Sequence, residues 1–228
     1  MATSLRNERL MEDASQAGLF PLWALSRLRM GTDGSGITAL VCAHGCPLNC
    51  AYCLNPGSRD PDASVRWIAP DELLQMVRKD GLYYSATGGG VCFGGGEPLT
   101  HASFISAFKR LIPSDWRISA ETSLYVPEDN VRIAAEAIDL CLVDIKDMNP
   151  AIYQAYTGRS NDLVLCNLER LLKTVSAERV VVRVPYIPDL NNEEDVRESV
   201  RRLKEMGVEK LDVFRYTVKN RKQSEKPR

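Results

Sequence analysis

Three cysteines in one short loop carry the strongest chemical signal in this chain of 228 residues. Cys46, Cys50 and Cys53 are spaced C-x3-C-x2-C, which lets one loop present three thiolates to a single iron–sulfur cubane. Three thiolates on a four-iron cluster leave one iron without a protein ligand, and an open iron is a place where a cofactor can bind. A zinc site normally takes four ligands from two separate pairs, and we find no second Cys or His pair downstream. The spacing favours a [4Fe–4S] cluster over zinc, or over a chance group of structural thiols.

A glycine run after the cysteine loop is a second candidate for ligand binding. The run is Gly94-Gly95-Gly96-Glu97-Pro98, and it follows a short apolar segment. Glycine suits a place where the backbone must come within hydrogen-bond distance of a ligand, and Glu97 adds a carboxylate. The alternative is a tight strand-to-helix turn, because glycine supplies positive φ and Pro98 can open a helix.

Polar residues also follow two later apolar segments. Thr122 and Ser123 sit in the run 121–123, where helix capping is the alternative to ligand binding. Asp144 and Lys146 flank Ile145, and an i, i+2 spacing on a strand places both charged side chains on one face. On an otherwise apolar strand that face must meet water, a partner or a ligand.

Arg183, beside Pro185, is a lone cation near the end of an apolar segment. Its planar guanidinium suits a carboxylate or a backbone carbonyl in a binding site. A surface ion pair is the alternative that the sequence leaves open.

The elements that position these residues alternate between strand-like and helix-like patterns. The expected strands are 37–42, 90–93, 116–120, 140–145, 179–184 and 210–214. The expected helices are 70–79, 101–111, 128–137, 163–175 and 192–206. Six strands alternating with helices predict an α/β fold with parallel pairing, closed as a partial (β/α)6 barrel whose sixth strand lies near the C-terminus. The candidate residues all fall at the carboxyl ends of strands, where barrels of this kind place their chemistry.

The remaining parts of the chain are expected to be simpler. We predict a helical or irregular leader over residues 1–30, one barrel domain over 31–217, and a basic, polar tail over 218–228. The apolar run 18–25 is too short for a membrane span and lacks a signal-peptide layout. A formal net charge of −1 implies no general affinity for nucleic acid or for an anionic membrane.

The pattern of cysteines indicates the cellular compartment of the protein. Cys92, Cys141 and Cys166 stand singly within apolar stretches, and we expect all three to be buried thiols. Together with the absence of a disulfide-like pattern, this predicts a reduced, cytoplasmic protein.

The cysteine loop resembles that of the radical S-adenosylmethionine (SAM) superfamily, whose pattern is C-x3-C-x-aromatic-C, with Tyr52 as the aromatic residue here. The glycine run is similar to the superfamily's Gly-Gly-Glu-Pro. The resemblance implies that the open iron binds the amino and carboxylate groups of SAM. Reduction of the cluster would then cleave SAM to a 5′-deoxyadenosyl radical, so that the cofactors supply the radical chemistry and the protein orients them.

Further motifs resemble one branch, the activating enzymes of glycyl radical enzymes, of which the pyruvate formate-lyase activating enzyme is the best known. The similar segments are 31–37, 83–91, 121–127, 142–146, 156–161 and 183–188. This resemblance implies hydrogen abstraction from one glycine of a glycyl radical enzyme, which is the protein partner. It also implies a flavodoxin- or ferredoxin-type electron donor. The short gap between Cys53 and Gly94 leaves no room for a ferredoxin-like insert, so one cluster is expected.

The resemblance also implies which residues contact the cofactors, with no residue acting as a general acid or base. Cys46, Cys50 and Cys53 would bind the cluster. The implied SAM contacts are Tyr52, Cys53, Leu54, Gly95, Gly96, Glu97, Thr122, Ser123, Asp144, Ile145, Lys146 and Arg183.

Some features depart from this branch and keep two other hypotheses open. The family often has His where Thr217 stands, and it usually continues with another helix beyond the sixth strand. A radical SAM enzyme that modifies a small molecule or a short peptide is the first alternative. An inactive barrel that serves as a binding or regulatory module is the second.

Overall fold

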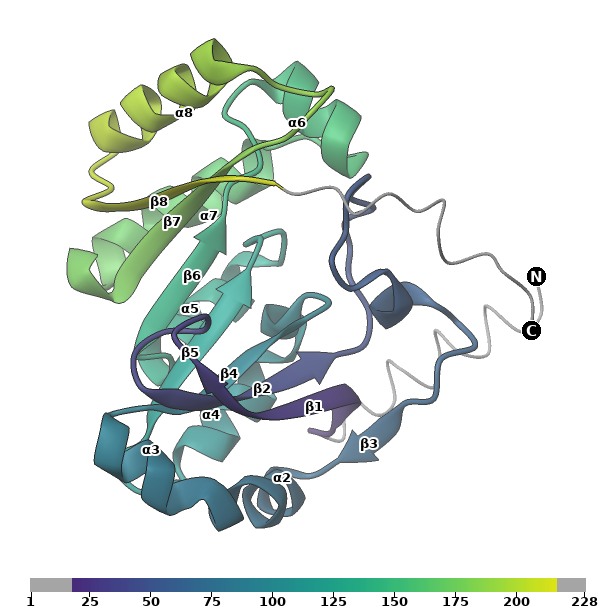
Figure 1. The fold of residues 1–228 in the computed structure, drawn as a ribbon, viewed down its shortest axis with the longest axis vertical. Coiled ribbons are helices and arrows are strands. Elements are labelled where there is room, and N and C mark those ends of the chain that lie inside the picture. The colour runs from purple at the N-terminus through teal and green to yellow at the C-terminus, as the bar shows by residue number, and fades with distance from the viewer. Residues whose placement is uncertain (1–17, 217–228) are drawn as a thin grey trace.

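The computed structural model describes residues 18–216, which form one curved sheet with helices along its outer side (Figure 1). The eight strands have the order β3-β1-β2-β4-β5-β6-β7-β8. From β2 to β8 all neighbours are parallel, whereas β1 pairs antiparallel with β2 and with β3. The strands are β1 (Phe20–Met30), β2 (Ile37–Ala43), β3 (Arg66–Ile68), β4 (Gly90–Gly95), β5 (Arg117–Thr122), β6 (Leu140–Asp144), β7 (Val180–Tyr186) and β8 (Lys210–Arg215).

The helices connect the parallel strands, and α2, α4, α5 and α7 pack side by side as one layer (Figure 1). They are α2 (Pro70–Val77), α3 (Gly81–Thr87), α4 (Ala102–Lys109), α5 (Glu128–Ala137), α6 (Pro150–Thr157), α7 (Asp162–Thr174) and α8 (Glu193–Glu205). Between residues 18 and 216, no helix is both long and apolar enough to cross a membrane.

The six predicted parallel strands and the partial barrel are confirmed. Each strand begins and ends within about two residues of its predicted range, because continuous apolar runs are typical of strands buried on both faces. The amphipathic helix α8 is also confirmed. The N-terminus of α8 is fixed by Asn192, whose side chain accepts hydrogen bonds from the backbone N–H groups of Glu194 and Asp195.

The prediction of a helical or irregular leader is wrong for Phe20–Met30, which form the strand β1. Phe20 and Leu22 are buried while the far half of the strand is exposed, so the segment has neither a helical nor an alternating pattern. Two register shifts against β2 further disrupt the alternation of buried and exposed side chains that is typical of a strand. The short strand β3 and the helices α3 and α6 were not predicted either. Thr217 and the tail lie outside the described residues.

The burial of one cysteine differs from the prediction. Cys92 and Cys141 are buried as expected, but Cys166 is exposed. The reason is its place on α7, whose buried face carries Val164, Asn167, Leu168 and Leu171, while Cys166 points away from that face.

Candidate active site

The cysteine loop follows β2 at the carboxyl end of the sheet and is held there by α6. The backbone N–H of Asn49 donates to the Thr157 carbonyl (3.0 Å), and that of Ala51 donates to the Tyr156 carbonyl (2.8 Å). These are carbonyls of the last turn of α6, which have no partner within the helix. The end of α6 thereby fixes the backbone on both sides of Cys50.

Two phenols hold the other end of the loop. The carbonyl of Tyr52 accepts hydrogen bonds from the hydroxyls of Tyr156 (3.2 Å) and Tyr216 (2.6 Å). Tyr156 belongs to α6, and Tyr216 directly follows β8. The loop is therefore tied to two elements that come much later in the sequence.

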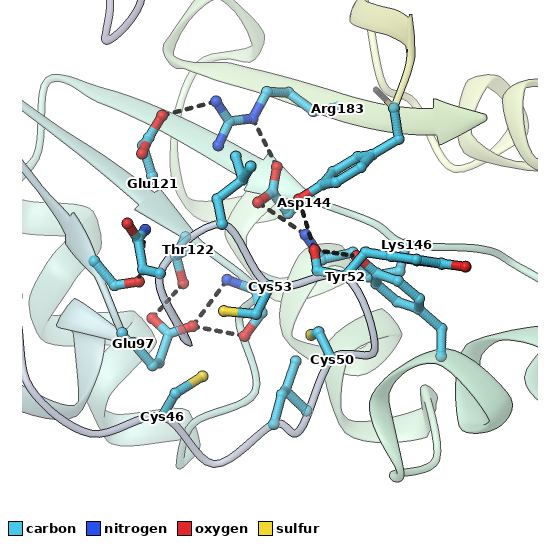
Figure 2. Close-up of a pocket in the computed structure, with 18 of the residues that line it drawn as sticks. Cys46, Cys50, Tyr52, Cys53, Glu97, Glu121, Thr122, Asp144, Lys146 and Arg183 are labelled. Carbon is cyan, nitrogen blue, oxygen red and sulfur yellow. Dashed lines mark hydrogen bonds and ion pairs between the residues drawn. The ribbon is translucent and has the colours of Figure 1, made fainter. Parts of the chain in front are cut away.

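All three predicted thiols line one cavity of about 320 Å³. In Figure 2 the cysteines lie along one side of it, and Glu121, Arg183 and Asp144 lie along the other. The described residues hold no group of three or more His, Cys, Asp or Glu side chains placed to bind one metal ion.

Burial is the main influence on the pKa of two of these thiols, Cys46 and Cys50. It raises the pKa of Cys46 to about 12. It also raises the pKa of Cys50, against the opposing effect of the nearby Lys146 ammonium. Binding to iron would replace the lost hydration of the thiolates.

Gly95 and Gly96 bring the end of β4 against the start of the cysteine loop. A Cβ on Gly96 would lie 2.0 Å from the Gly45 carbonyl oxygen, and a Cβ on Gly95, where φ is +89°, would lie 2.7 Å from the Cys42 Cβ. The contact is fixed by Gly96 N–H donating to the Ala43 carbonyl (2.9 Å). Side chains are therefore excluded at both glycines, as the motif requires.

Glu97 is buried at 1% exposure, and its carboxylate accepts four hydrogen bonds. Oε1 accepts from the Thr122 hydroxyl (2.7 Å) and the Leu99 N–H (3.2 Å), while Oε2 accepts from the Ser123 hydroxyl (2.6 Å) and N–H (2.8 Å). All four donors are neutral. Burial raises the pKa of Glu97, although these hydrogen bonds oppose the effect.

A chain of ion pairs joins three strands across the cavity (Figure 2). Arg183 on β7 donates to Glu121 on β5 (2.8 Å) and to Asp144 at the end of β6 (2.6 Å), and Lys146 donates to Asp144 (3.0 Å). Burial favours protonation of Asp144, but the two cations outweigh it and hold its pKa below the usual range. Asp144 and its two cations thus stay charged and oriented.

The structure brings most of the predicted contacts together but not all of them. Eleven of the twelve predicted SAM contacts line the cavity, and Leu54 stands at its mouth with 78% exposure. Ile145 does not line it, because its side chain points into the hydrophobic core on the other face of the strand. Further lining residues that the sequence analysis did not select are Leu48, Asn55, Glu121, Tyr156, Asp212, Phe214 and Tyr216.

Two of these missed residues had a signal in the sequence. Glu121 opens the motif that supplied Thr122 and Ser123, and a strand places it on the face opposite Thr122. Tyr156 lies in a motif similar to the glycyl-radical branch, but no part of the sequence indicated that α6 holds the cysteine loop. Asp212 and Phe214 carry no local signal and reach the cavity because β8, the last strand of the curved sheet, lies beside it.

Comparisons with known proteins agree with this geometry. Residues 40–218 match the profile of a family described as the Radical SAM superfamily. The (2S)-3-sulfopropanediol dehydratase activating enzyme of Klebsiella oxytoca is 36% identical over 150 residues, which cover 64% of this chain and 47% of that protein. The pyruvate formate-lyase-activating enzyme of Clostridium pasteurianum is 29% identical over 191 residues, which cover 81% of this chain and 77% of that protein. The chain thus spans about half the length of the first of these relatives.

Among solved structures, Streptococcus suis SuiB bound to the precursor peptide SuiA aligns with a TM-score of 0.60 and 14% identity. The alignment covers 78% of this chain and 38% of SuiB. At that identity the likeness is one of fold, and it agrees with the partial barrel.

Proposed function

The chain belongs to the radical SAM superfamily, and on that premise we propose that it is the activating enzyme of a glycyl radical enzyme. The observation that carries the proposal is a single cavity that joins the three cysteines to Glu97 and to the Asp144–Lys146 pair. The names of the two relatives described above support the branch. Cytoplasmic location remains a prediction of the sequence.

The proposed cofactors are a [4Fe–4S] cluster and SAM. When bound and reduced, the cluster would supply the electron that cleaves SAM to methionine and a 5′-deoxyadenosyl radical, which takes a hydrogen atom from a partner glycine. Cys46, Cys50 and Cys53 would bind three of the four irons. Their common cavity and the backbone restraints on Cys50 fit this role.

Glu97 and the neighbouring glycines would bind the ammonium group of SAM. The carbonyl of Gly95 already accepts a hydrogen bond from the Asn55 side-chain amide (3.2 Å), which fixes the orientation of that peptide. A carbonyl oxygen has a second lone pair for a ligand. The Glu97 carboxylate adds a negative charge that no described cation neutralises, so it favours a positively charged ligand group nearby.

The ion-pair chain would bind the polar remainder of SAM. Lys146 is suited to the carboxylate of the methionine part, and the Asp144 carboxylate is suited to ribose hydroxyls. Arg183 donates to Asp144 from the opposite side, so these groups are already oriented before the ligand binds. Binding would then require little rearrangement.

No residue of the cavity is needed as a general acid or base in this proposal. The protein's contribution is to position SAM and the partner glycine and to exclude water and oxygen. The partner segment would reach the cavity at its mouth, beside Leu54 and Phe214. A flavodoxin- or ferredoxin-type protein would supply the electron.

The proposal is tested by anaerobic reconstitution with iron and sulfide, followed by reduction in the presence of SAM. We expect 5′-deoxyadenosine to form only when all three cysteines are present. Adding a glycyl radical enzyme, with the Klebsiella oxytoca (2S)-3-sulfopropanediol dehydratase as the first choice, should give a glycyl radical signal in electron paramagnetic resonance (EPR). Formation of 5′-deoxyadenosine without a glycyl radical on any such enzyme would favour a small-molecule or peptide substrate instead.

The binding assignment has a separate test. Asp144→Ala and Lys146→Ala should each weaken SAM binding by about tenfold or more while leaving the iron content unchanged, because each removes one partner of a largely buried ion pair. Binding is measured calorimetrically on the reconstituted protein. Normal affinity in both variants would contradict the proposed pocket.

A further inference from the structure

The strand β8 forms one edge of the sheet (Figure 1). Among residues 18–216 it pairs only with β7, in a parallel register that runs from Val181 and Lys210 to Tyr186 and Arg215. In the part of the chain that the structure describes, the other side of β8 therefore has no neighbouring strand. An open edge of this kind presents backbone N–H and C=O groups that can pair with another extended chain.

The ladder with β7 shows which groups of β8 point to the open edge. The N–H of Tyr216, directly after β8, donates to the Tyr186 carbonyl (2.9 Å), so Tyr216 directs this group towards β7. In a parallel ladder every second residue of a strand bonds the same neighbour. Residues 212 and 214 therefore bond β7, whereas Leu211 and Val213 direct their backbone N–H and C=O groups to the open edge.

The side chains of β8 place this edge beside the proposed active site. Asp212 and Phe214 line the cavity, and Val213, on the opposite face of the strand, is 51% exposed. A strand added beside β8 would continue the sheet, so every second side chain of it would lie on the cavity face. A glycine at such a position would direct into the cavity the hydrogen that replaces its side chain.

Asp212 indicates the charge of the chain that would occupy this edge. Its register partner on β7 is Arg183, but the Arg183 guanidinium bonds Glu121 and Asp144 instead. The exposed Asp212 carboxylate forms no ion pair with a described cation and favours a basic side chain on a strand beside it. That side chain would be two residues from the glycine when the glycine lies beside Phe214.

We propose that the glycine-bearing segment of the partner enzyme binds as an added strand along the open edge of β8, with a basic side chain beside Asp212. The backbone groups of Leu211 and Val213 would hold the segment, and the alternation of the added strand would direct the glycine into the cavity. The inference rests on the proposed function, because that function supplies the glycine-bearing partner. It adds the surface that binds the segment and the charge that this surface selects.

The first test uses reconstituted, SAM-loaded protein and a short fluorescent peptide centred on the radical-site glycine of the Klebsiella oxytoca (2S)-3-sulfopropanediol dehydratase. A set of these peptides carries one backbone N-methyl group each, at successive positions. We expect affinity, measured by fluorescence anisotropy, to fall by about tenfold or more at every second position, where the N–H bonds β8, and to change little between them. Loss at consecutive positions, or at none, would overturn the inference.

A second set of peptides tests the charge by placing lysine or glutamate two residues before or after the glycine. Wild-type protein should bind one lysine peptide about fivefold more tightly than its glutamate counterpart, and Asp212→Lys should reverse that preference. The reversal should occur on one side of the glycine only, because Asp212 has one direct neighbour in an added strand. The same preference in both proteins would contradict the proposed pairing with Asp212.

Val213→Pro tests the open edge with the whole partner enzyme. Proline removes the N–H that points to this edge, and edge strands tolerate proline because that N–H has no partner in the sheet. We expect the glycyl radical yield, measured by EPR, to fall by about tenfold or more, while 5′-deoxyadenosine formation without the partner stays as in wild type. Val213→Ala is the matched control. It removes the exposed side chain but keeps the N–H, so it should activate the partner normally.

Two further outcomes would refute the use of this edge by the partner. One is a normal radical yield in Val213→Pro. The other is a wild-type dimer, measured by analytical ultracentrifugation, that Val213→Pro abolishes, because the edge would then bind a second copy of this chain. If wild-type protein forms no 5′-deoxyadenosine or no glycyl radical, the proposed function itself fails. A wild type that forms both, beside an unaffected Val213→Pro, refutes only the inference, so the two failures are distinguishable.

Discussion

Two buried carboxylates lie at opposite ends of the barrel, and their surroundings differ in kind. Asp33, near the amino ends of the strands, receives two hydrogen bonds from the Arg29 guanidinium (2.5 and 2.8 Å) and one from the Thr38 hydroxyl (3.2 Å). Glu97, at the carboxyl ends, receives four hydrogen bonds from neutral groups only. Burial favours protonation of both, but at Asp33 the Arg29 cation and the hydrogen bonds of Thr32 and Thr38 together outweigh burial and hold the pKa below the usual range.

The difference separates a structural charge from a ligand-binding charge. Asp33 and Arg29 neutralise each other, and the Ser119 hydroxyl donates to the Asp33 carbonyl (2.8 Å), so the charge of Asp33 is already paired within the protein. The cavity at the other end is lined by four carboxylates and two cations and keeps a net negative charge. We infer that changes at Glu97 act on binding, whereas changes at Asp33 act on stability.

The largest expected effect is at the cluster ligands of the carboxyl end. Cys50→Ala should remove the cluster and abolish 5′-deoxyadenosine formation, because two thiolates remain for a cubane that needs three from this loop. Iron analysis and the visible absorbance of the reconstituted protein measure the loss. Cys166→Ser is the matched control, since Cys166 is an exposed cysteine on α7, and it should retain full iron content. Unchanged iron in Cys50→Ala would refute the ligand assignment.

At Glu97, removal of the charge alone should lower SAM affinity. Glu97→Gln keeps the size of the side chain but loses the negative charge. We expect affinity to fall about 10- to 100-fold, or about 1.4 to 2.8 kcal/mol. Calorimetric titration of the reconstituted protein measures the change. Asp33→Asn should bind SAM as wild type does, and a similar loss in both variants would remove the distinction between the two ends.

Asp33→Asn should instead lower the free energy of unfolding. The substitution removes charged hydrogen bonds of a fully buried carboxylate, for which about 1.5 to 3 kcal/mol is typical. Arg29 is one third exposed, so water compensates in part and we expect about 1.5 kcal/mol. Denaturant unfolding measures the difference. Asp129→Asn, which breaks an exposed ion pair with Arg132, should cost less than about 0.5 kcal/mol.

The sequence predicted the carboxyl end of the barrel better than the opposite end. The cysteine spacing, the glycine run and the Asp144–Lys146 pair are local patterns, and parallel strands bring their carboxyl ends together whatever the details of packing. The burial of Asp33 depends on Arg29, which belongs to β1. Because β1 was predicted to be a helical or irregular leader, its pairing with β2 could not be foreseen.

Long-range contacts account for the other omissions. The role of α6 follows from hydrogen bonds between Tyr156 or Thr157 and a loop about 100 residues earlier, and no local pattern encodes such a contact. Ile145 is the opposite case, because it was implied as a SAM contact but does not line the cavity. Its position between two charged residues placed it in the implied binding set, but the alternation of a strand sends its side chain to the core.

The smallest expected effect is a difference in how the two carboxylates respond to pH. Asp33 has a folded-state pKa below its ordinary value of 3.8, so its stabilising contribution is present above pH 3.8 and is lost as the pH falls through the lowered pKa. Glu97 has a folded-state pKa above its ordinary value of 4.5. As the pH falls through that raised pKa, the folded protein takes up the proton before the unfolded chain does, and stability rises.

The two responses therefore have opposite signs and separate pH windows. Unfolding free energies of wild type, Asp33→Asn and Glu97→Gln between pH 3 and 7 would resolve them, with each slope limited to about 1.4 kcal/mol per pH unit. The stability advantage of wild type over Asp33→Asn should shrink below pH 3.8. The stability of wild type relative to Glu97→Gln should instead increase on acidification from neutral pH towards 4.5. If both differences changed in the same direction, Glu97 would be a paired charge like Asp33, and the carboxyl end would hold no unneutralised carboxylate for a cationic ligand.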